Sequence, residues 1–134
     1  MSDEQRGNVE RLLGWAHILI AVLILPTATF FGLWFAPVLI AGPVWLAGLG
    51  VRLMRRRPEA WAMARRTHLV AGPLAILLGV YGLFAISEAA LSASEGGGLL
   101  GAFGYYPLTV AFGLAAVSAV TLVLSWREGR GTEA

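Results

Sequence analysis

The sequence has no cysteine and no lysine among its 134 residues. Without thiols the chain cannot form disulfides, Cys-ligated zinc sites, iron–sulfur clusters or the thioether links of covalent haem. Without lysine it cannot form a Schiff base, which excludes a retinal-type pigment. Any chemistry must therefore come from other residue types.

Charge is also scarce. Only 13% of the residues are charged, 57% are hydrophobic, and the mean hydropathy is +0.72. A soluble core of this length could not bury so much apolar surface. The apolar stretch behind the mixed-charge N-terminus is longer than a signal-peptide core, so we expect it to be retained as a first span. The sequence predicts one integral membrane domain over residues 1–134.

The charge-free blocks predict the number of helices. Forty consecutive residues between Arg11 and Arg52 carry no charge, twice the roughly 20 that one helix needs to cross a bilayer. This block must hold two helices, with a break near 32–37. We expect an all-α, up-down bundle with an outer loop over 87–106 and four spans, at about 12–31, 38–54, 67–86 and 107–126.

The arginines predict the orientation of this bundle. All of them lie before the first span, between the last turn of the second span and the start of the third, or after the fourth, and Trp15, Trp61 and Trp126 lie beside them. This is the positive-inside pattern with both termini and the middle loop cytoplasmic, in an inner or plasma membrane. The net charge is +2. The basic residues behind it lie at the predicted membrane edges and form no stripe on a soluble surface, which argues against nucleic acid as a partner.

Two histidines are the only chemical lead in the spans. His17 and His68 lie on the first and third spans, which run in the same direction, so both imidazoles are expected at a similar depth. Each lies on a helical face made largely of small residues, and Gly72 and Gly79 share the face of His68. The first and third helices of an up-down bundle form a diagonal pair about 11–14 Å apart.

This pattern has two interpretations. In the first, the histidines pack or hydrogen-bond between helices, as polar residues among small ones commonly do in membranes. Alternatively, they are the axial ligands of a b-type haem, with Gly72 and Gly79 leaving lateral room for the macrocycle. Arg65, with Arg66 or Arg11, would then meet the propionates. A chlorophyll-type pigment with one histidine on its magnesium is a variant of this second interpretation.

Other function classes find less support. The interior of the spans lacks the carboxylate or arginine that coupled transporters usually carry, because Arg52 lies in the last turn of the second span. Their hydroxyl groups have no matching base, so no independent catalytic centre is visible. The general plan resembles the b-type cytochrome subunits of respiratory complexes, without a shared motif. We expect a small electron-transport subunit that works with other membrane chains and with a quinone. The alternative is a cofactor-free accessory subunit packed against a larger respiratory or photosynthetic complex.

Overall fold

The computed structural model describes residues 1–27, 36–92 and 98–132, and these residues confirm the predicted all-α class. The elements are α1 (Asp3–Ile24), the short 3-10 helix η1 (Leu25–Thr27), α3 (Ala36–Met54), α4 (Ala60–Ser92) and α5 (Gly98–Thr132).

Local sequence signals account for several helix ends. Ser2 and Gln5 form a capping box at the start of α1, which satisfies backbone donors that the first turn leaves open. Pro37 lies in the first turn of α3, where its missing N–H costs no hydrogen bond. The C-terminus of α3 closes with a hydrogen bond of 3.1 Å from the Arg57 N–H to the Arg52 carbonyl. Arg56, inside this closing turn, has a φ of 52°, a conformation usually taken by glycine.

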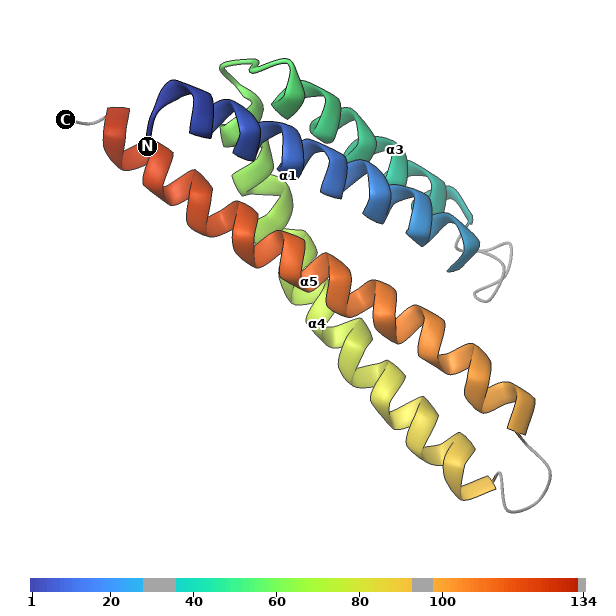
Figure 1. Cartoon of the computed structure of the whole chain (residues 1–134). Coiled ribbons are helices and arrows are strands. Elements are labelled where there is room, and N and C mark those ends of the chain that lie inside the picture. Colours follow the sequence, from blue (N-terminus) through green and yellow to red (C-terminus); the bar gives the residue numbers. More distant parts are fainter. Residues whose placement is uncertain (28–35, 93–97, 133–134) are drawn as a thin grey trace.

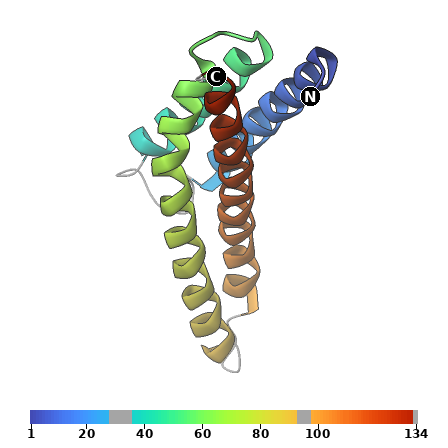
Figure 2. The ribbon, with the colours of Figure 1, turned by 90° about the vertical axis from the view of Figure 1, so that its left-hand side faces the viewer.

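The helices are arranged as two antiparallel hairpins. α1 packs along α3, and α4 packs along α5. The two hairpins meet through less extensive packing of α1 against α5 and of α3 against α4. Figures 1 and 2 show the hairpins inclined to each other, with α4 and α5 extending well beyond α1 and α3. In this order of packing, α1 and α4 belong to different hairpins and are not main packing partners.

Ion pairs bring three chain segments to one end of the molecule. Arg6 of α1 pairs with Glu128 of α5 at 2.7 Å, and Arg56 of the α3–α4 turn approaches Glu10 of α1 at 3.4 Å. The start of α1, the α3–α4 turn and the end of α5 therefore lie together, and we call this the arginine end.

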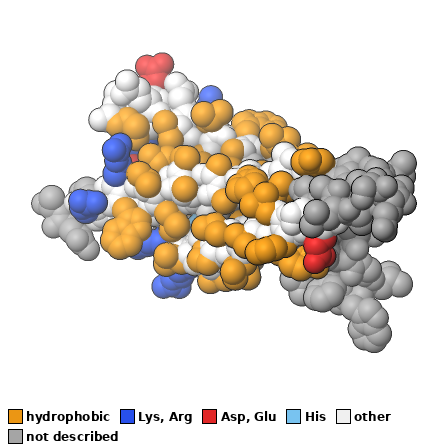
Figure 3. All heavy atoms as spheres, turned by 90° about the horizontal axis from the view of Figure 1, so that it is seen from below, with side chains coloured by type: hydrophobic (Ala, Val, Ile, Leu, Met, Phe, Trp, Pro, Cys, Tyr) orange, Lys and Arg blue, Asp and Glu red, His pale blue; other side chains and the backbone are white. Residues whose placement is uncertain are grey.

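The surface suits a lipid environment. Three helical segments are long and apolar enough to span a membrane, namely Asp3–Thr27, Ala60–Phe84 and Tyr105–Arg130, whereas the apolar part of α3, Leu39–Met54, is shorter. Large apolar side chains along α4 stay exposed, among them Leu77 and Phe84. Figure 3 shows hydrophobic side chains covering the middle of one face and basic side chains gathered toward one end. The bilayer environment is supported, and a fourth span remains a prediction.

The loop predicted over 87–106 is wrong in extent. α4 continues to Ser92 and α5 already begins at Gly98. Residues 87–92 consist mostly of good helix formers and contain no proline, so nothing ends the helix once Ile86 is passed. The other predicted break, near 32–37, falls mainly on residues 28–35, which lie outside the described part of the chain.

Candidate functional site

His17 lies near the middle of α1 and is wholly buried, with 0% of its surface exposed. Its Nδ1 is 2.7 Å from the carbonyl oxygen of Leu13, one turn earlier in the same helix. A carbonyl only accepts hydrogen bonds, so Nδ1 must carry the hydrogen. In a neutral ring this leaves the lone pair on Nε2, which points away from α1.

His68 of α4 meets His17 directly and is equally buried. The two Nε2 atoms are 2.7 Å apart, and the rings stand edge to face with centroids 4.9 Å apart and planes at 70°. Nδ1 of His68 is 2.8 Å from Oγ of Ser118 on α5. Three helices from both hairpins therefore converge on this pair of imidazoles.

The direction of the hydrogen bonds follows from the Leu13 carbonyl. Because His17 Nε2 accepts, His68 Nε2 must donate to it, and the lone pair of a neutral His68 then lies on Nδ1. Ser118 completes the series by donating its hydroxyl hydrogen to that atom. Every polar atom of both rings has a partner, as expected for buried imidazoles.

The glycines of the predicted site serve helix packing in this structure. A Cβ at Gly72 would lie 3.5 Å from Ser118, and one at Gly79 would lie 3.9 Å from Ala111. Both glycines therefore face α5. The lateral room expected beside a macrocycle is filled by that neighbouring helix, and the role of these glycines in cofactor binding stays a prediction.

The predicted arginines lie toward the arginine end, with Arg65 and Arg66 within one turn before His68 on α4 and Arg11 on α1. Arg65 is partly buried, and its Nη1 would be 3.6 Å from a Cβ at Gly129 of α5. Arg66 and Arg11 are exposed. The contacts of these arginines do not test their predicted role with propionates.

The residues fit a haem iron in donor type and direction but not in spacing. Metal-bound histidines usually give their second N–H to an oxygen acceptor, and the Leu13 carbonyl and Ser118 hydroxyl are placed for this. Two metal–imidazole bonds of about 2 Å each would set the Nε2 atoms about 4 Å apart, whereas they are 2.7 Å apart here. A bound iron would need the two Nε2 atoms about 1 Å further apart, and a macrocycle around it would also need the space that α5 fills beside Gly72 and Gly79.

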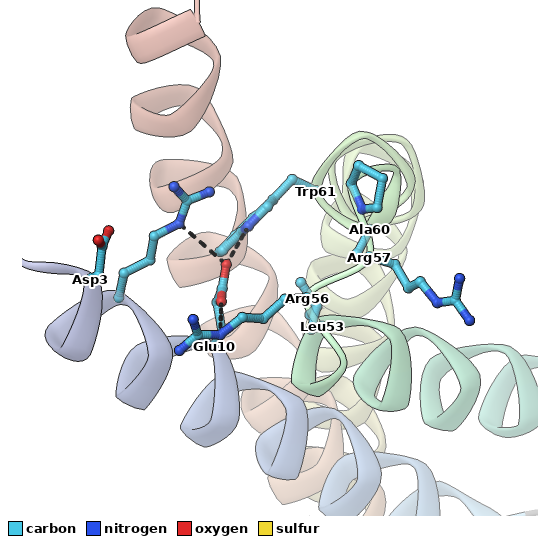
Figure 4. A pocket seen from close by; sticks show the side chains of 9 residues that line it. Asp3, Glu10, Leu53, Arg56, Arg57, Ala60 and Trp61 are labelled. Carbon is cyan, nitrogen blue, oxygen red and sulfur yellow. Dashed lines mark hydrogen bonds and ion pairs between the residues drawn. The ribbon is translucent and has the colours of Figure 1, made fainter.

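A second polar cluster surrounds Glu10, which is one of the two carboxylates that line a cavity at the arginine end. Oε1 of this buried residue accepts hydrogen bonds from Arg6 Nε at 3.4 Å and Trp61 Nε1 at 3.1 Å. Figure 4 shows Trp61 and Arg56 converging on the carboxylate from opposite sides. Sequence reasoning assigned no role to Glu10, although it lies two turns before His17 on the same helical face.

The described residues contain no group of three or more His, Asp or Glu side chains placed to hold a metal ion. Neither cluster therefore forms a metal site made of protein ligands alone. The pair of histidines is the arrangement that the sequence singled out. The chain matches no protein-family model, no curated protein sequence and no solved structure.

Proposed function

We propose that this protein is a small membrane subunit that holds a b-type haem between His17 and His68 and passes electrons. The observation that supports the proposal is the convergence of the two Nε2 atoms between the hairpins, while both Nδ1 atoms face an oxygen that can accept a hydrogen. Such second partners orient metal-bound imidazoles and raise their basicity.

The protein residues would have distinct roles at this site. His17 and His68 supply two neutral ligand atoms, and the bound haem would supply reversible one-electron exchange at its iron. For His68 Nε2 to act as a ligand, its hydrogen must move to Nδ1, and the Ser118 hydroxyl must turn from donor to acceptor. Ser118 is suited to this because a hydroxyl can take either role. Arg65 and Arg66 would provide charge for the propionates.

The wider setting is part of the same proposal. We place four spans in an inner or plasma membrane, with the arginine end and both termini in the cytoplasm. The ion pairs of Arg6 and Arg56, which bring the chain ends and the α3–α4 turn together, support this arrangement. So little of the chain lies outside the helices that we expect other membrane subunits, and a quinone near the arginine end, to complete the electron path.

The decisive experiment is a reduced-minus-oxidised absorbance spectrum of the protein purified from its native membrane. We expect a b-type band in the intact protein and its loss in both His17→Ala and His68→Ala. Ser125→Ala is the control, because Ser125 is also buried on α5 and, among the described residues, its hydroxyl donates to the Leu122 carbonyl of its own helix alone. A pigment-free intact protein would refute the haem, and a chlorin spectrum would favour the pigment variant.

A cofactor-free accessory subunit is the second candidate. The direct Nε2–Nε2 distance of 2.7 Å favours it, since the imidazoles already satisfy each other without a metal. The pair would then act as a buried hydrogen bond that joins the hairpins. This candidate predicts stoichiometric co-purification with a larger membrane complex and no absorbance beyond that of the aromatic residues.

A further inference from the structure

The cavity at the arginine end has the features of a ligand site. Its volume is about 250 Å³, and Asp3, Glu10, Arg56 and Trp61 are among the residues that line it. Pockets for small molecules usually measure roughly 300–1,000 Å³, so this one suits a headgroup rather than a large molecule. It lies beside the α3–α4 turn and a partly buried tryptophan, which is the level expected for the membrane–water interface.

One oxygen in this cavity has no hydrogen-bond donor. The Glu10 side chain is only 5% exposed, yet its Oε2 accepts no hydrogen bond within the described structure. Arg56 Nε lies 3.4 Å from Oε2 and compensates its charge without the alignment of a hydrogen bond. A buried carboxylate oxygen in this state favours a ligand that brings an N–H or O–H group.

Charges of both signs line the cavity. Its wall has three arginines, Arg6, Arg56 and Arg57, and two carboxylates, Asp3 and Glu10, and Arg6 is also paired with Glu128, which lies outside the lining. A zwitterionic ligand has separate groups for the carboxylate and the guanidinium side chains of such a wall.

We propose that this cavity binds the headgroup of an amine-bearing zwitterionic phospholipid, phosphatidylethanolamine. The ammonium group donates a hydrogen bond to Glu10 Oε2, and the phosphate lies toward Arg57. The Arg57 side chain is exposed and makes no hydrogen bond or ion pair to the described residues, so it is available for a phosphate. Binding this lipid would hold α1 and the α3–α4 turn together, and it does not depend on the haem proposal.

The test compares two lipids that differ only at the nitrogen. Phosphatidylcholine has the same phosphate as phosphatidylethanolamine, but its methylated nitrogen has no hydrogen to donate. We would delipidate the full-length protein in detergent, add equal amounts of the dioleoyl forms, and count bound lipids by native mass spectrometry. A charge-assisted hydrogen bond predicts about a tenfold preference for phosphatidylethanolamine.

Three variants separate the parts of the site. Glu10→Gln should bring the preference close to one. Arg57→Gln should weaken both lipids by a similar factor and leave the preference unchanged, and it keeps the proposal testable if Glu10→Gln does not fold. Glu4→Gln is the control, because Glu4 is an exposed acid on α1 that does not line the cavity.

Equal binding of the two lipids by the intact protein would overturn the proposal. So would a full preference in Glu10→Gln, or stronger binding of phosphatidylglycerol than of phosphatidylethanolamine, because an anionic headgroup would then be recognised through the arginines alone. The absorbance of the histidine site is recorded separately, so failure here would leave the haem proposal as it stands.

Discussion

At the scale of single residues, the main feature is a series of hydrogen bonds through two buried rings. Ser118, His68, His17 and Leu13 are linked by contacts of 2.7–2.8 Å that cross from α5 through α4 to α1. Each bond polarises the next, because the donor and acceptor roles are fixed along the series. Such a network stabilises the fold when it is complete. Removing one member leaves a buried polar atom without a partner, which destabilises the fold.

Ser118→Ala should destabilise the protein by about 1–3 kcal/mol, because it leaves Nδ1 of a buried His68 without a partner. The measurement is the free energy of unfolding in mixed micelles. Thr121→Val is the matched control on the same helix, because within the part of the chain that the structure describes the Thr121 hydroxyl bonds the Val117 carbonyl one turn away and nothing else. Equal losses for the two variants would show that His68 does not depend on Ser118.

At the scale of helices, the close approach of α1 and α3 depends on two glycines. A Cβ at Gly50 would lie 2.6 Å from the carbonyl oxygen of Gly14 and 3.1 Å from Cβ of His17. No real side chain tolerates the first distance, so any larger residue at Gly50 must push α1 away. The position of His17 is thus set partly by the absence of a side chain on the helix behind it.

Gly50→Ala should therefore destabilise the α1–α3 hairpin by about 1–3 kcal/mol, the usual cost of overpacking. Gly48→Ala is the control, because nothing lies within 4 Å of a Cβ there. It should leave stability unchanged or raise it by up to about 1 kcal/mol through better helix propensity. Unfolding midpoints of the two variants in the same detergent give the comparison, and similar values would contradict the close packing.

At the scale of the whole molecule, the arrangement of the chain ends predicts which residues are accessible from one side of the membrane. The chain has no cysteine, so single cysteines can be placed at the exposed residues Ser2, Arg57 and Ser87. Ser2→Cys and Arg57→Cys lie at the arginine end and should react with an impermeant maleimide from the cytoplasmic face only. Ser87→Cys, far along α4, should react only from the opposite face.

The labelling is done on right-side-out and inverted vesicles, with detergent-solubilised protein as the measure of full reactivity. If α3 does not cross the bilayer, Ser2→Cys and Arg57→Cys will label from different faces. This outcome would remove the four-span topology, and it would also contradict the ion pair between Arg56 and Glu10 that places the α3–α4 turn beside the start of α1.

The fold and the site differed in how far the sequence predicted them. Helix positions followed from long uncharged blocks, because any charge inside lipid is costly. The outer loop was predicted too long, because a helix can continue past the end of its apolar span, as α4 does to Ser92. Two partners of Glu10 were not predicted, because Arg56 and Trp61 come from other segments of the chain, whereas Arg6 is its i,i+4 neighbour on α1.

The sequence by itself determined an all-helical, lipid-facing chain with its basic residues at helix ends and two histidines on helices that share a direction. These properties depend on the composition of each segment and on the spacing of its residues along a helix, and both can be read within a single segment. Only the tertiary structure decided that the imidazoles touch, that Ser118 joins them, that Gly72 and Gly79 pack against α5, and that one oxygen of Glu10 is left without a donor. Those features depend on how the two hairpins approach each other, and that approach is set by side chains far apart in the chain.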